Sequence, residues 1–226
     1  MTAAEGWLAA AWRVVRRGLP DPPAGVVELG CGPLGGFVPM LLADGYDAMG
    51  VDPKAPEEAP YQRVEFERAE LPQVVDALVA STSLHHVGDP TEVIERIAEA
   101  VRPGGVVVVV EWASERFDEP TARWCFDRLG PEEGWLKELR DEWRASDLDW
   151  SSYLEGWLER EGLHSGETLV RLLDERLERR QLEYGPYFFA DLADVTETDE
   201  QAAIDAGQVQ AGRIDYVGTR PRNAHA

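Results

Sequence analysis

The fold of this chain is decided by one short stretch near its start, Val26-Val27-Glu28-Leu29-Gly30-Cys31-Gly32-Pro33-Leu34-Gly35-Gly36-Phe37. An apolar run breaks into a glycine turn, and an apolar pattern with helical spacing follows over residues 37–42. Strand, tight turn and helix in this order open a nucleotide-binding βαβ unit. Glycines at positions 30 and 32 let the backbone approach a ligand closely. The helix beyond them is expected to offer free N–H groups to a negative group.

Two carboxylates that flank this turn bear on the choice of ligand. Asp52 ends a second short strand, where an acid can accept both hydroxyls of a ribose. Glu28 lies beneath the turn, where it would repel a pyrophosphate and favour an ammonium group. The spacing of Gly30, Gly32 and Gly35 matches the dinucleotide fingerprint, which would favour NAD(P). S-adenosylmethionine (SAM) has a ribose, no phosphate and a cationic amino-acid end, so the carboxylates favour SAM.

Composition and charge narrow the class of protein. The chain has 226 residues, 44% of them hydrophobic, which predicts one domain with a sizeable core and room for an inserted subdomain. The net charge of −21 would repel a phosphate backbone and argues against a nucleic-acid partner. No apolar run reaches the roughly 18 to 20 residues of a membrane helix, and the first apolar stretch lacks the charge order of a signal peptide.

Cysteine and arginine usage point to the compartment and the source. Cys31 and Cys125 are too few for a disulfide framework, so a reducing compartment is expected. We therefore predict a cytoplasmic protein without a membrane partner. The basic residues are nearly all arginine, which is typical of a GC-rich bacterial genome.

Strands and helices alternate over residues 25–112, which predicts a parallel sheet with right-handed crossovers. Only helical periodicity follows over 113–176, and strand spacing then returns. The expected strands are 25–30, 47–52, 63–67, 74–80, 106–110, 179–189 and 213–219. The other expected helices are 5–18, 36–44, one that is capped by Asp89 or Thr91, and 198–207. Residues 53–60 are expected to be a loop and 103–105 a turn.

This pattern predicts the domain organisation. Residues 1–112 would form the SAM-binding core with its N-terminal helix, and 113–176 an inserted helical lid. Residues 177–220 would complete the core sheet, and 221–226 would be a disordered tail.

Five motifs follow one another along the predicted core. They are Glu28-Leu29-Gly30-Cys31-Gly32, Asp52, Glu67-Arg68-Ala69-Glu70-Leu71-Pro72, Ser83-Leu84-His85-His86-Val87 with Asp89, and Val101-Arg102-Pro103-Gly104-Gly105. Together they resemble the class I SAM-dependent methyltransferases, in particular the bacterial small-molecule type. The resemblance implies a Rossmann-like α/β fold whose seven-stranded, mostly parallel sheet has its last strand inserted antiparallel. The chain departs from the family at Leu34, where a third glycine is common.

The resemblance also implies how SAM would be held. Asp52 falls at the ribose acid, Glu67 at the acid that takes the adenine amino group, and Glu28 near the SAM amino group or a backbone N–H. The predicted cofactor-binding set is Glu28, Gly30, Cys31, Gly32, Asp52, Glu67, Arg68 and Ser81. Cys31 is interpreted as a packing residue and not as a nucleophile.

Candidate catalytic residues follow two neighbouring strands. His85 and His86 come after strand four, and Glu111 ends strand five. Ligands bind beyond the carboxyl ends of such strands, so a histidine and the glutamate would meet there as base and orienting acid. The alternative is that one histidine only packs or caps the loop and that Glu111 pairs elsewhere. No metal site is predicted.

The tryptophans suggest where an acceptor would bind. Six of the eight lie between residues 112 and 157, so they concentrate in the predicted lid. Their stripes either pack the lid onto the sheet or form an aromatic face for an apolar acceptor.

Three functions remain open from sequence. The first is a SAM-dependent methyltransferase that acts on a small organic acceptor as a monomer or homodimer and releases S-adenosylhomocysteine. The second is an NAD(P)-dependent oxidoreductase, and the third is a non-catalytic SAM-binding protein.

Overall fold

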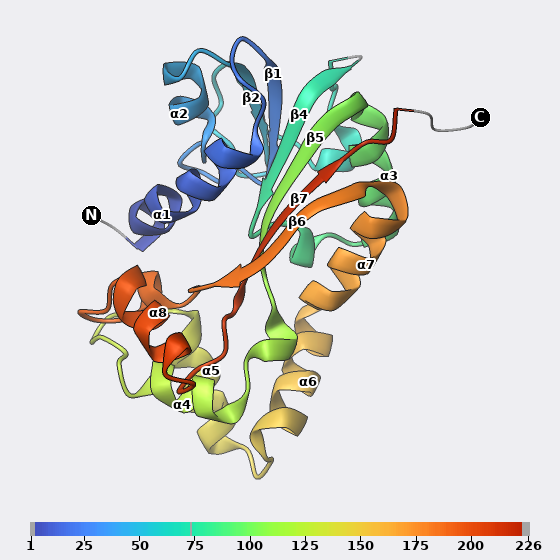
Figure 1. Ribbon diagram of the computed structural model, residues 1–226. Helices are drawn as coiled ribbons and strands as arrows, with labels where there is room; N and C mark the ends of the chain where they lie inside the picture. The colour runs from blue at the N-terminus through green and yellow to red at the C-terminus, as the bar shows by residue number, and fades with distance from the viewer. Residues whose placement is uncertain (1–2, 73, 223–226) are drawn as a thin grey trace.

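The core of the computed structural model, which describes residues 3–72 and 74–222, is one seven-stranded sheet (Figure 1). Its strands follow the order β3-β2-β1-β4-β5-β7-β6, and β7 runs antiparallel to both of its neighbours. This confirms the predicted Rossmann-like fold with an inserted antiparallel last strand. The strands are β1 Gly25–Leu29, β2 Asp47–Val51, β3 Tyr61–Gln62, β4 Val75–Ser81, β5 Val101–Trp112, β6 Glu178–Gly185 and β7 Arg213–Thr219.

Helices cover both faces of the sheet (Figure 1). α1 (Ala3–Gly18) and α2 (Val38–Ala43) pack on one face, and α3 (Pro90–Ala100) and α7 (Gly166–Arg176) pack on the other. In β4, Ala77 and Val79 belong to the core between the sheet and α1 and α2, whereas Leu78 and Ala80 belong to the core between the sheet and α3 and α7. Alternate side chains of a strand point to opposite faces, which explains why β4 reads as a continuous apolar run.

A helical lobe lies beyond the carboxyl end of β5. It contains α4 (Glu119–Phe126), α5 (Trp135–Ala145) and α6 (Trp150–Glu161), with α8 (Glu197–Asp205) beside α4 (Figure 1). These helices have a separate core that includes Phe117, Leu136, Trp150 and Phe188. The predicted lid over residues 113–176 is thus divided by its packing, because Leu169 and Leu173 of α7 belong to the sheet core.

Short 3₁₀ turns connect the larger elements at the edge of the sheet. They are η1 (Phe66–Arg68), η2 (Leu84–His86), η3 (Ser114–Arg116) and η4 (Phe189–Asp191). The expected cap of α3 is Asp89, whose Oδ1 accepts a hydrogen bond from the backbone N–H of Thr91 at 2.9 Å.

Three strand predictions were wrong in their bounds. β3 was expected over 63–67, but residues 61–62 pair with Gly50 and Val51 at the edge of the sheet. β5 runs from Val101 to Trp112 and includes the expected 103–105 turn, because a register shift against β4 absorbs the extra residues. β6 ends at Gly185, well before residue 189.

Two further expectations concern the ends of the chain and membranes. The predicted tail falls mostly on residues 223–226, which lie outside the described part of the chain. Among the described residues, no helix is both long enough and apolar enough to span a bilayer.

Candidate functional site

Two cavities open at the carboxyl ends of β1, β2, β4 and β5. The smaller, of about 230 Å³, includes Gly30 and Asp52 in its lining, and we call it the turn cleft. The larger, of about 520 Å³, lies between the sheet and the helical lobe, and we call it the aromatic cavity. Thr82 and His86 line both, so the two spaces adjoin at these residues.

The turn cleft brings together three of the predicted cofactor residues, Gly30, Asp52 and Glu67. Gly30 has a φ of +79°, and a Cβ there would collide with the side chain of Ser83, so the position requires glycine. The lining contains the carboxylates of Asp52, Glu65 and Glu67 and no lysine or arginine. This set of donors and acceptors fits a cationic ligand with a ribose, such as SAM, and opposes a pyrophosphate.

Asp52 holds the glycine turn as well as facing the cleft. Its Oδ2 accepts a hydrogen bond from the Gly32 N–H at 3.1 Å, and its Oδ1 accepts one from the Lys54 N–H at 2.6 Å. The carboxylate is therefore fixed at the end of β2, in the lining of the turn cleft.

Glu28 lies behind the turn and is buried. Its Oε2 accepts hydrogen bonds from the N–H groups of Phe37 at 2.7 Å and Val38 at 3.1 Å. Burial raises its pKa to about 8, although these two bonds lower it. The expectation of free N–H groups at the start of the helix was therefore wrong, because Glu28 already occupies two of them. A pyrophosphate would have to displace it.

Five of the eight predicted cofactor residues line neither cavity: Glu28, Cys31, Gly32, Arg68 and Ser81. Arg68 is exposed on η1. Ser81 is buried inside β4, and its hydroxyl makes no hydrogen bond within residues 3–72 and 74–222. Cys31 is buried in the turn, where desolvation and the nearby Glu28 raise its pKa to about 12. A protonated, enclosed thiol suits the packing role expected for Cys31.

His85 and Glu111 meet where η2 passes the end of β5. The His85 Nδ1 lies 2.6 Å from the Glu111 Oε2. Glu111 is buried, and its oxygens also accept hydrogen bonds from the N–H groups of Ser83 and Leu84, at 2.7 Å each, and of Trp112, at 3.0 Å. The predicted meeting of a histidine with the glutamate is present in the structure, so the alternative that Glu111 pairs elsewhere was wrong.

Each member of the His85–Glu111 pair shifts the pKa of the other in the direction that favours its charged form. Burial would raise the pKa of Glu111, but His85 and the backbone N–H groups lower it below its usual value. Burial would likewise lower the pKa of His85, but the charge and hydrogen bond of Glu111 raise it above its usual value. The Nδ1 of His85 is bound to Glu111, and the residue lines the aromatic cavity.

The neighbouring histidines have different environments. His86 lies on the rim, its ring centroid 4.1 Å from that of His85, and partial desolvation together with the positive charge of His85 lowers its pKa. His164 holds the segment that contains η2 in place. Its backbone N–H donates to the His85 carbonyl at 3.0 Å, and its Nε2 donates to the Val87 carbonyl at 2.8 Å.

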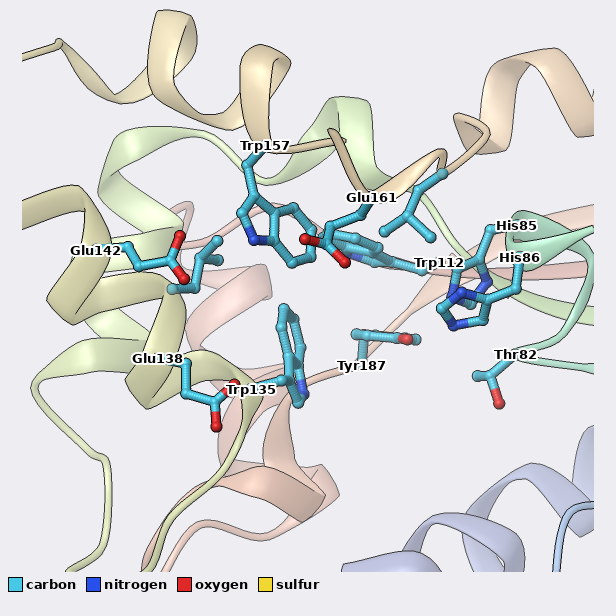
Figure 2. A pocket seen from close by; sticks show the side chains of 12 residues that line it. Thr82, His85, His86, Trp112, Trp135, Glu138, Glu142, Trp157, Glu161 and Tyr187 are labelled. Atoms are coloured by element: carbon cyan, nitrogen blue, oxygen red, sulfur yellow. The ribbon is translucent and has the colours of Figure 1, made fainter. Parts of the chain in front are cut away.

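Four aromatic rings form the wall of the aromatic cavity, Trp112, Trp135, Trp157 and Tyr187 (Figure 2). Trp112 stacks on Tyr187 with centroids 6.0 Å apart, and Trp135 meets Trp112 edge-on at 5.5 Å. Burial raises the pKa of Tyr187 well above its usual value, so its hydroxyl stays neutral. Trp150 packs inside the lobe, as the packing interpretation of the tryptophans predicts. Trp112, Trp135 and Trp157 line the cavity, and their contact with an acceptor stays a prediction.

Sequence reasoning missed several residues of the site. Thr82 joins the two cavities, and Glu65 and Ser83 line the turn cleft. Thr82 and Ser83 directly follow β4, a position that the strand pattern did offer as a signal. Tyr187 belongs to the segment expected as the strand over 179–189, and its place in the cavity depends on how the lobe packs.

Comparisons with known proteins agree with this geometry. A family model described as "Methyltransferase domain" matches residues 8–176. A SAM-dependent methyltransferase from Mesorhizobium loti is 20% identical, with a TM-score of 0.60 over 96% of this chain and 100% of that one. A putative SAM-dependent methyltransferase from Listeria monocytogenes is 15% identical, with a TM-score of 0.60 over 96% and 99%.

A third solved structure contains a product of methyl transfer. The N-methyltransferase NodS from Bradyrhizobium japonicum WM9, in complex with S-adenosyl-L-homocysteine, is 13% identical, with a TM-score of 0.53 over 94% of this chain and 86% of that one. At these identities the structural likenesses establish the fold alone. No curated protein has a matching sequence.

Proposed function

Because this chain belongs to the methyltransferase-domain family, we propose that it methylates a small organic molecule bound in the aromatic cavity. The protein is by its family a SAM-dependent methyltransferase, which opposes the NAD(P) alternative. One observation carries the choice of acceptor site: the turn cleft and the aromatic cavity adjoin at Thr82 and His86. A methyl donor in the cleft would therefore lie next to an acceptor in the cavity.

The turn cleft is the proposed SAM site. Asp52 would accept hydrogen bonds from the ribose hydroxyls, Glu67 would take the adenine amino group, and the glycine turn would lie along the amino-acid end. Phe66 and Val51 supply apolar surface for the base. The bound cofactor supplies one electrophilic methyl group carried on a sulfonium.

The aromatic cavity would hold the acceptor and exclude water around it. Methyl transfer is an in-line displacement, so positioning the two partners at contact distance supplies much of the rate. When the acceptor is a hydroxyl, His85 would take its proton at Nε2, and Glu111 would fix the ring through Nδ1. Glu111 is thus a positioning residue.

A transfer assay tests this function. SAM with a labelled methyl group is incubated with the protein and with phenols, amines or carboxylic acids, and both the labelled product and S-adenosylhomocysteine are measured. We expect equal amounts of the two products with at least one acceptor class. Binding of SAM with no transfer to any class would instead support the non-catalytic alternative.

Replacing Asp52 by alanine should weaken SAM binding at least about tenfold, the loss of one charge-assisted hydrogen bond. Calorimetry measures the Kd directly. Asp47→Ala is the matched control, because Asp47 lies at the exposed start of the same strand, away from the cleft. An unchanged Kd in Asp52→Ala would show that another group holds the ribose.

The pH dependence of turnover should report on His85. A base must first lose its proton, so turnover should rise with pH, and its midpoint should lie above the usual histidine pKa of about 6.5. Glu111→Gln removes the charge that raises this pKa and should move the midpoint downward. The raised pKa of His85 also makes a contribution to fold stability that is fully present below its unfolded-state pKa and is lost as pH rises through the folded value. A midpoint that is identical in the two proteins would argue against His85 as the base.

A further inference from the structure

The aromatic cavity has a marked excess of negative charge. Glu138, Glu142 and Glu161 line it, and its lining contains no lysine or arginine. Glu142 accepts a hydrogen bond from the Tyr153 hydroxyl at 3.1 Å and lies 3.5 Å from the exposed Arg160 guanidinium. The carboxylates of Glu138 and Glu161 have no ion pair within the described ranges, 3–72 and 74–222. The negative charge of the wall is therefore largely uncompensated.

Two of these three carboxylates lie away from the proposed methyl-transfer point. Glu138 and Glu142 lie one helical turn apart on α5 and so share a face of that helix. Figure 2 shows them at the side of the cavity opposite His85, His86 and Thr82. The rings of Trp135 and Tyr187 lie between the two ends (Figure 2).

Both the carboxylates and the aromatic rings that line the aromatic cavity attract a cation. Carboxylates pair with an ammonium group, and the faces of tryptophan and tyrosine rings bind it through cation–π attraction. An anionic acceptor would be repelled by the same groups. A cation at the far end of the cavity would also be kept away from the positive sulfonium, which it would repel.

We propose that the acceptor is a molecule with an aromatic or apolar body, a protonated amine at one end and a nucleophilic hydroxyl at the other. Glu138 and Glu142 bind the amine, the four rings enclose the body, and the hydroxyl faces His85. This rests on the proposed function, because it assumes that transfer takes place where the two cavities adjoin. The hydroxyl oxygen forms a bond to the methyl carbon, the methyl–sulfur bond breaks with its electron pair left on sulfur, and the hydroxyl proton passes to His85.

Three probes of one shape test the charge preference. All carry a 4-hydroxyphenyl group on a short chain that ends in an ammonium (tyramine), a hydroxyl (4-hydroxyphenylethanol) or a carboxylate (3-(4-hydroxyphenyl)propanoate). Calorimetry with S-adenosylhomocysteine present should show the amine binding at least about tenfold tighter than the alcohol. The carboxylate should bind most weakly, and added salt should reduce the advantage of the amine.

Two double variants locate the preference. In Glu138→Gln/Glu142→Gln the amine should bind no better than the alcohol, while the affinity for the alcohol stays the same. Glu155→Gln/Glu159→Gln removes the same charge from exposed positions of α6 that do not line the cavity, and it should keep the preference. Equal affinity for the three probes, no amine binding at about 10 mM, or a preference that survives in the first variant would overturn the proposal. Failure of the proposed function would show differently, as absent SAM binding or absent transfer to any acceptor.

Discussion

His85→Ala should lower turnover with a hydroxyl acceptor by about 10²- to 10⁴-fold, the usual contribution of a general base. The ring is buried, its Nδ1 is held 2.6 Å from the Glu111 carboxylate, and it lines the aromatic cavity. The turn cleft does not include His85 in its lining, so the Kd for SAM should stay close to that of the unchanged protein. Steady-state kinetics and calorimetry measure the two quantities separately.

The neighbouring histidine is the comparison for this variant. His86 has no carboxylate partner among the described residues and lies on the rim, so His86→Ala should reduce turnover less. Added imidazole should restore part of the turnover of His85→Ala, because it can occupy the vacated space and accept a proton. A merely structural role would give no such rescue. If the two variants lose activity equally and imidazole has no effect, His85 is not the base.

Glu111→Ala should lower the free energy of unfolding by about 3 to 5 kcal/mol, the usual cost of breaking a buried ion pair. Glu111 accepts hydrogen bonds from three backbone N–H groups as well as from His85, and alanine would leave all of these donors unpaired inside the protein. Urea unfolding followed by circular dichroism measures the change.

An exposed glutamate provides the control for this loss. Glu159→Ala on α6 removes the same charge at the surface and should change the free energy of unfolding by no more than about 0.5 kcal/mol. If Glu111→Ala were equally mild, the hydrogen bonds around the pair would contribute little. Turnover should also fall in Glu111→Ala, because nothing then fixes the His85 ring.

Much of the sheet was predictable because its strands carry local signals. β4 is apolar on both faces and β1 runs directly into the glycine turn, so both could be placed from residue patterns. The meeting of His85 with Glu111 also followed from strand order. β3 could not be placed, because Tyr61 and Gln62 form a two-residue, half-buried edge strand with no periodicity to detect.

The aromatic cavity was less predictable because its wall is assembled from distant segments. Trp112 ends β5, Trp135 and Trp157 belong to two helices of the lobe, and Tyr187 follows β6. Their proximity depends on packing between these segments, which no local pattern specifies. For Glu28 the sequence left two partners open, the SAM amino group or a backbone N–H, and the structure shows it bound to the N–H groups of Phe37 and Val38.

The separate core of the helical lobe has a consequence for protein engineering. Leu136 and Trp150 belong to the core of the lobe, which reaches the sheet through Trp112 at the end of β5, whereas the buried apolar residues of the turn cleft belong to a core of the sheet. Directed evolution toward new acceptors can therefore randomise lobe positions and leave the residues of the turn cleft unchanged. Such libraries should keep their affinity for SAM while their acceptor range drifts.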